Sequence, residues 1–127
     1  MSDEEKDDYA INRTLNGHNK HIKHEFTRKE NGEYLSEIVD ILTQNDIKVY
    51  FFITPYTRNY LKYIDSRYKP DILNALNNLK DPVEFLDMND YSDIFSDEDF
   101  IDSDHLNKQG AIKATALLNE YIALAEE

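Results

Sequence analysis

The residue types best suited to chemistry lie in one short segment near the C-terminus, where Asp102 is followed three positions later by His105. An aspartate at this spacing can accept the Nδ1–H of the imidazole and fix its tautomer, which leaves Nε2 free to take a proton from a nucleophile. The pair therefore predicts the orienting carboxylate and the general base of a hydrolytic triad. The spacing alone is weakly specific, because the surrounding segment is rich in aspartate.

The longer string around this pair is more specific. It reads Phe100-Ile101-Asp102-Ser103-Asp104-His105-Leu106-Asn107, followed by Gly110-Ala111 and a helical pattern. This string resembles the terminal block of the SGNH, or GDSL-like, hydrolases, particularly bacterial members associated with acyl transfer to cell-surface polymers. The upstream helix, strand and Thr54-Pro55 turn are also similar to that group, so the resemblance covers about residues 9–120. It implies that Asp102 and His105 are the catalytic orienter and base of an ester hydrolase or acyl-transfer protein.

The chain departs from that family at the nucleophile. The family's serine lies in a Gly-Asp-Ser-type block after the first strand, and its oxyanion hole adds a glycine and an asparagine from two middle blocks. None of the three glycines here precedes a serine in a strand-to-helix elbow. Without a nucleophile and oxyanion donors His105 has no proton to take. We therefore expect a truncated, C-terminal portion of an SGNH-like protein that is inactive alone.

Three serines lie near His105 in the sequence, but each is in a flexible acidic loop with no helix N-terminus to supply oxyanion donors: Ser92, Ser96 and Ser103. We do not expect any of them to replace the missing nucleophile.

Histidines and aspartates elsewhere suggest metal sites less strongly. His18, His21 and His24 are spaced so that they can share a helix face and bind zinc, but they alternate with lysines, which favours a solvated polar face. The aspartate-rich loop lacks the central glycine and closing glutamate of an EF-hand. We expect neither a metal ion nor a cofactor.

The elements that must position Asp102 and His105 follow from hydrophobic periodicity. Helices are predicted over 31–45, after Tyr56, over 70–79 and over 107–125, and short strands over 47–53 and 83–88. On the first of these helices, the predicted buried face consists of Tyr34, Leu35, Ile38, Ile41 and Leu42. Helices alternating with strands predict an α/β fold with a short parallel sheet flanked by helices, and the resemblance implies a partial flavodoxin-like, three-layer arrangement.

Ligands of open parallel sheets bind beyond the carboxyl ends of the strands, where the loops beginning at Thr54 and Asn89 are expected to meet. Tyr56 lies in the first of these loops and is the predicted substrate-binding residue, for an acyl ester. Tyr60 and Tyr63 are at helical spacing, which favours packing roles.

Composition limits the remaining possibilities. The 127 residues suffice for one domain, predicted over 9–127 after an acidic run at 1–8 that is expected to be a disordered, solvated tail or else a frayed helix start. A net charge of −12 argues against nucleic acid and anionic lipid as partners. No signal peptide or membrane span is visible, so a cytoplasmic location is expected for the chain as given, although full-length relatives can be membrane-anchored.

Two strands leave two unpaired sheet edges, and such sheets are marginal alone. We therefore expect a homo-oligomer, such as a dimer, or a protein partner paired through the edge of the 47–53 strand. An alternative function follows from the charge: a small acidic inhibitor or immunity-type module that is steered onto a basic target.

Overall fold

Two short strands, β1 (Tyr50–Ile53) and β2 (Glu84–Asp87), form the single sheet of the computed structural model, which describes residues 1–127. The strands pair in parallel, with Phe52 opposite Leu86. The remaining regular structure is mostly helical, so the predicted mixed α/β class and the parallel pairing are confirmed. Each strand has one neighbour, and each therefore keeps an unpaired outer edge.

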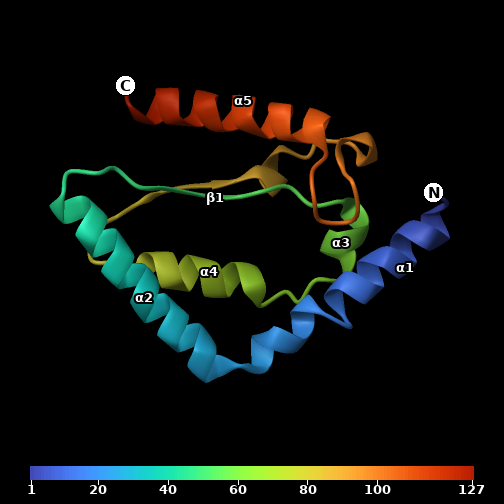
Figure 1. Ribbon diagram of the computed structural model, residues 1–127, viewed down its shortest axis with the longest axis horizontal. Helices are drawn as coiled ribbons and strands as arrows, with labels where there is room; N and C mark the ends of the chain where they lie inside the picture. The colour runs from blue at the N-terminus through green and yellow to red at the C-terminus, as the bar shows by residue number, and fades with distance from the viewer.

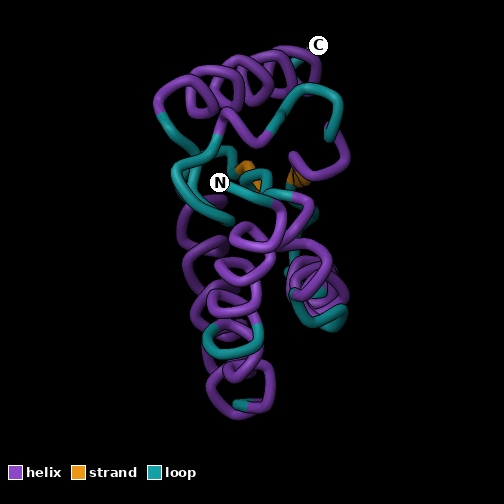
Figure 2. The backbone as a smooth tube through the Cα atoms, turned by 90° about the vertical axis from the view of Figure 1, so that its right-hand side faces the viewer, coloured by secondary structure: helices purple, strands orange, loops and turns teal.

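The helices lie on both sides of this strand pair. Figure 1 shows α5 (Lys108–Ala125) on one side and α2 (Glu25–Gln44) with α4 (Tyr68–Asn77) on the other, and the view in Figure 2 agrees. The remaining elements are α1 (Asp3–Thr14), η1 (His18–Lys23), α3 (Arg58–Tyr63), η2 (Met88–Tyr91) and η3 (Asp97–Asp99). None of the helices combines the length and hydropathy required to cross a bilayer.

Strand β1 is shorter than the strand predicted over 47–53, because the first of those residues belong to the C-terminal cap of α2. Asp46 has a φ of 57°, in the left-handed region, and the Ile47 N–H donates to the Leu42 carbonyl over 2.9 Å. This six-to-one bond satisfies a terminal helix carbonyl. Ile47 therefore belongs to the helix cap, and the ladder starts only at Tyr50.

The N-terminus differs from the predicted disordered tail at 1–8, since α1 begins at Asp3. Ser2 Oγ accepts the Glu5 N–H, and the Glu5 carboxylate accepts the Ser2 N–H over 2.6 Å. This reciprocal capping box satisfies two N–H groups at the helix start. The pattern Ser-x-x-Glu is visible in the sequence, but the acidic run around it favoured a solvated tail.

The buried side of α2 also differs from the prediction. Val39 is buried, with Leu35 and Leu42 half-buried beside it. Tyr34, Ile38 and Ile41 instead form a second apolar stripe that faces solvent. Because the two stripes are adjacent on the helix, hydrophobic periodicity could not separate them.

The main buried apolar cluster joins α5 to β2 and η2 through Leu86, Met88, Ala114 and Leu117. Helix α5 begins at the predicted position, because the Asn107 carboxamide oxygen accepts the Gly110 N–H over 3.0 Å and caps the first turn. Gly110 brings this turn against the segment before it: an added Cβ would lie 2.2 Å from the Asp99 carbonyl oxygen and 2.8 Å from Leu106. The start of α5 is therefore fixed on the loop that contains Asp102 and His105.

We expect Gly110→Ala to lower the free energy of unfolding by about 1–3 kcal/mol, since the methyl group must displace backbone. Gly32 provides the matched control, because a Cβ there meets nothing within 4 Å. Gly32→Ala in the middle of α2 should raise the free energy of unfolding by about 0.5–1 kcal/mol. Urea denaturation followed by circular dichroism measures both, and equal effects would contradict this account of the α5 start.

Candidate functional site

The loop that contains Asp102 and His105 is closed by backbone pairing at its base. Phe100 and Leu106 form an isolated antiparallel bridge, and the Ile101 N–H donates to the His105 carbonyl over 2.8 Å. Inside the loop, Asp102 Oδ1 accepts the N–H groups of Asp104 (3.0 Å) and His105 (2.8 Å). An aspartate that binds backbone N–H groups two and three residues ahead holds a tight turn. The turn brings the two predicted residues together.

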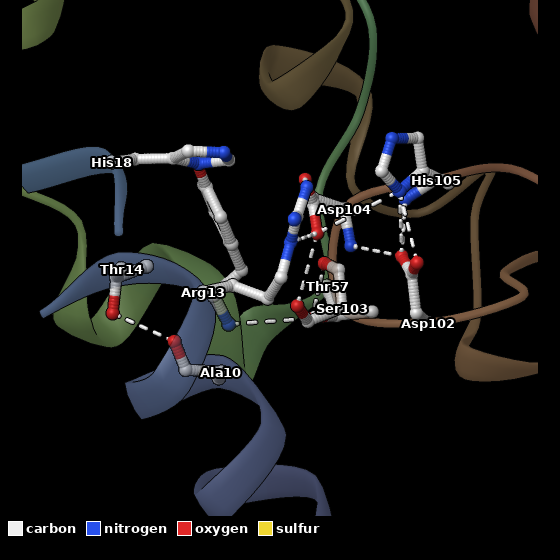
Figure 3. A network of polar contacts seen from close by, with 10 residues as sticks. Ala10, Arg13, Thr14, His18, Thr57, Asp102, Ser103, Asp104 and His105 are labelled. Atoms are coloured by element: carbon white, nitrogen blue, oxygen red, sulfur yellow. Dashed lines mark hydrogen bonds and ion pairs between the residues drawn. The ribbon is translucent and has the colours of Figure 1, made fainter. Parts of the chain in front are cut away.

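The predicted pair is formed in the structure. His105 Nδ1 lies 2.9 Å from Asp102 Oδ2 and 3.0 Å from Oδ1 (Figure 3). The imidazole is 58% exposed, and its Nε2 has no partner in the protein. This geometry suits a neutral imidazole that donates Nδ1–H to the carboxylate and offers the Nε2 lone pair to solvent.

The charge on Asp102 is stabilised by this arrangement. Burial raises the pKa of the carboxyl, but hydrogen bonds from the Asp104 N–H and from the ring and backbone of His105 outweigh it. The net effect is a pKa below the ordinary aspartate value. The carboxylate is therefore ionised at neutral pH, as an orienter must be.

Two residues that are distant in the sequence, Thr57 and Arg13, bind this loop. The Ser103 carbonyl accepts both the N–H (3.1 Å) and the Oγ–H (2.8 Å) of Thr57, the residue that caps α3. Asp104 receives two bonds from Arg13 on α1, at 2.9 Å from Nε and 2.7 Å from Nη2 (Figure 3). A two-point guanidinium–carboxylate contact of this kind fixes orientation as well as distance. Sequence reasoning did not single out Arg13, which lies 91 positions from its partner.

The largest cavity beside this loop has a volume of about 680 Å³ and lies at the carboxyl ends of both strands. Its walls include residues from both strand ends and the turn after β1, from α3 and α4, and from the loop that contains Asp102 and His105: Ile53, Asp87, Tyr56, Tyr60, Tyr68 and Asp104. The rings of Tyr56 and Tyr60 lie 4.6 Å apart, while Tyr63 is not in the wall. The predicted strand-end location of a ligand pocket thus coincides with a real cavity, and Tyr56 is part of it.

Several polar groups in the cavity wall are paired with one another. The Asp87 carboxylate lies 2.7 Å from Lys69 Nζ and accepts the Asn89 N–H over 2.9 Å. Burial raises the pKa of Asp87, but the bonds from Lys69 and Asn89 lower it below the ordinary value. His18 Nδ1 lies 2.7 Å from the Tyr60 hydroxyl, and burial lowers the pKa of His18. The pocket is therefore apolar and aromatic, with hydrogen-bonding groups that are already oriented.

The neighbouring serines do not complete a triad. Ser92 and Ser96 line a separate hollow of about 250 Å³, and the buried Ser103 donates its Oγ–H to Asp104. None of the hydrogen bonds in the structure joins a hydroxyl to His105 Nε2. Within this chain, the base therefore has no nucleophile in place.

The three N-terminal histidines do not gather their ring nitrogens around one point. His18 is bonded to Tyr60, the ring centroids of His21 on η1 and His24 just after it lie 6.0 Å apart, and the three do not form a group of converging ligand atoms. One group of three possible ligands does converge within 4.8 Å, namely Asp102, Asp104 and His105. Arg13 occupies both oxygens of Asp104, and Nδ1 of His105 faces Asp102, so these atoms already have partners.

Comparison with known proteins shows that the chain belongs to a family. A family model matches residues 1–125, almost the whole chain. The chain belongs to this uncharacterised family. No curated protein and no solved structure matches it. The likeness to SGNH hydrolases therefore depends on the residues quoted above, and what it implies for function is a proposal.

We expect Arg13→Met to lower the free energy of unfolding by about 2 kcal/mol, because it leaves the nearly inaccessible Asp104 carboxylate unpaired. Arg67→Met is the matched control, since Arg67 is well exposed and pairs with Asp65 only two positions away. Arg67→Met should lower the free energy of unfolding by less than about 1 kcal/mol. Urea denaturation measures both, and equal losses would show that the Arg13–Asp104 pair does not hold the loop.

The pKa of Asp102 predicts a pH dependence of stability. Because its pKa is lower in the folded protein, the charged carboxylate stabilises the fold above the ordinary aspartate pKa, and this stabilisation is lost as the pH falls through the folded value. The difference in unfolding free energy between the wild type and Asp102→Asn should thus be constant above about pH 5 and should shrink below about pH 4. Urea denaturation across this range measures the difference, and one that persists unchanged at low pH would contradict the assignment.

Proposed function

We propose that this chain supplies the orienting carboxylate and general base of an SGNH-type ester hydrolase or acyl-transfer centre, whose serine comes from another polypeptide segment. The observation that supports this most directly is the 2.9 Å contact between Asp102 and Nδ1 of His105, with Nε2 open to solvent. Accordingly, we assign the helix-flanked parallel strands to part of a flavodoxin-like, three-layer arrangement.

In the proposed reaction, His105 Nε2 takes the proton of the serine hydroxyl as the serine oxygen attacks the acyl carbon. Asp102 stabilises the imidazolium through the Nδ1–H bond and stays ionised. Nε2 then returns the proton to the leaving alcohol, and the acyl group remains on the serine until water or an acceptor alcohol removes it. All steps that this chain performs are proton transfers at one nitrogen atom.

The unpaired edge of β1 is the proposed entry point for the serine-bearing segment. A strand that paired with it in parallel would end at the same side of the sheet as Ile53. Residues after that strand would then lie beside the turn from Thr54 to Thr57, which holds the catalytic loop through Ser103. The new strand would also lie beside Phe52, which is 47% exposed although its partner in register, Leu86, is 3% exposed.

The substrate is proposed to be an acyl ester whose apolar part enters the 680 Å³ cavity. Tyr56 is the proposed substrate-binding residue, since its ring lies in the wall and its backbone N–H is held by Asn89 over 2.9 Å. Tyr60 stacks behind it, and burial raises the pKa of Tyr60, so its hydroxyl stays neutral. An aromatic wall of this kind suits the hydrocarbon part of an acyl ester.

The proposal predicts the tautomer of His105. In the neutral ring the proton should be on Nδ1, with the Nε2 lone pair exposed. In Asp102→Ala the proton should move to Nε2, because the acceptor at Nδ1 is lost. Long-range nitrogen–proton NMR correlations distinguish the two tautomers, and the exposed His24 serves as an internal control that should not change.

Two results would contradict the proposal. A wild-type ring protonated on Nε2 would show that Asp102 does not orient His105 for base catalysis. Turnover of an aryl ester by this chain alone, abolished in His105→Ala, would show that the nucleophile lies within the chain. We expect the chain alone to give no turnover above the buffer rate.

A further inference from the structure

The exposed face of α2 has the composition of a buried one. Tyr34, Ile38 and Ile41 are 54%, 54% and 61% exposed, although they follow one another at four- and three-residue spacing along a single stripe. A helix stripe of this kind normally packs against another element. In this structure the stripe of α2 at Leu35, Val39 and Leu42 faces the protein, so the stripe at Tyr34, Ile38 and Ile41 is left without cover.

The border of this stripe is strongly acidic. Between Glu30 and Asp46 the chain contains five acidic residues and no basic one. Glu30 and Glu37 project beside the stripe by helical geometry, and the Tyr34 hydroxyl donates to the Glu30 carboxylate over 3.3 Å. A partner that covered the apolar residues would therefore place its own border against carboxylates.

The surface area of the protein leaves room for such a partner. The accessible surface is 8785 Å², whereas a compact chain of 15.0 kDa exposes about 7,000 Å². The excess of about 1,700 Å² is larger than the roughly 800 Å² that each partner buries in a standard interface. The exposed α2 stripe contributes to this excess, and Phe26 in the same helix is 78% exposed.

We propose that the exposed face of α2 binds a basic amphipathic helix of a different protein. The apolar side of that helix would cover Tyr34, Ile38 and Ile41, and its lysines or arginines would lie against Glu30 and Glu37. Three apolar residues over about two helical turns match the anchor spacing by which helices recognise each other. A second copy of this chain fits poorly, because a symmetric contact would oppose two acidic borders on molecules of charge −12.

This interaction makes no use of Asp102 or His105 and does not depend on the proposed hydrolytic centre. A probe with defined chemistry can therefore test it alone. We suggest two fluorescent helical peptides of about 18 residues, with the same leucine face but with lysine or glutamate on the polar face. Fluorescence anisotropy then measures their binding to the full chain.

The lysine peptide should bind, and the glutamate peptide should not. Ile38→Ser should weaken binding by about tenfold or more, because it removes the central apolar anchor, while His105→Ala should leave it unchanged. The double variant Glu30→Lys/Glu37→Lys should reverse the preference, so that the glutamate peptide binds better. The matched control Asp81→Lys/Asp93→Lys changes the net charge equally at two exposed positions away from α2 and should retain the wild-type preference.

Three outcomes would overturn the proposal. The first is no binding of the lysine peptide by a folded wild-type chain, with folding checked by circular dichroism. In the second, both charge-reversal variants lose binding equally, which would show attraction to the net charge alone. The third is a wild-type dimer in light scattering that becomes a monomer in Ile38→Ser, which would make a second copy the occupant of this face.

Discussion

Pairing of buried aspartate carboxylates with basic side chains from other elements holds the strand ends and the loop that contains Asp102 and His105 in place. Asp99, Asp87 and Asp104 are each almost inaccessible to solvent. Lys113 on α5, Lys69 on α4 and Arg13 on α1 approach them to within 2.7–2.8 Å. A buried charge that lost its partner would be strongly destabilising, so these contacts fix how the helices sit around the loop. The position of His105 depends on all three, because its loop lies between them.

Such polar contacts matter more here because the apolar core is small. The main buried cluster contains only four residues, all at the junction of α5 with β2 and η2. Asp99 illustrates the compensation: it is completely buried, yet it accepts bonds from Lys113, Gln109 and the Ser96 N–H. Apolar side chains that would form a larger core instead remain on the surface of α2 and on the outer side of β1. The same shortage of internal packing thus explains both the buried charges and the exposed apolar faces.

Features that are local in sequence could be predicted, and those that join distant segments could not. Asp102 and His105 are three residues apart, and the turn between them is closed by their own backbone, so spacing was sufficient. The helix predicted over 107–125 starts at the expected position for the same reason, because Asn107 caps its first turn. Arg13 binds Asp104 across 91 positions, and no pattern in one sequence connects the two. The prediction of the buried face of α2 was wrong for another reason. Which of its two apolar stripes is buried depends on the elements packed beside the helix, and hydrophobic periodicity does not encode these.

The structural needs of the loop account for Asp102 but leave the imidazole of His105 unexplained. Asp102 Oδ1 accepts two backbone N–H groups, so a carboxylate or carboxamide is required there to hold the turn, whatever the loop does. His105 serves the turn only through its backbone, which donates to Asp102 and accepts from Ile101. Its ring is mostly exposed and contacts only the carboxylates of its own loop, Asp102 at 2.9 Å and Asp104 at 3.8 Å, and contacts as exposed as this contribute little to stability. Almost any side chain would satisfy the fold at position 105, and for this reason the proposed function depends more on the oriented imidazole than on the aspartate beside it.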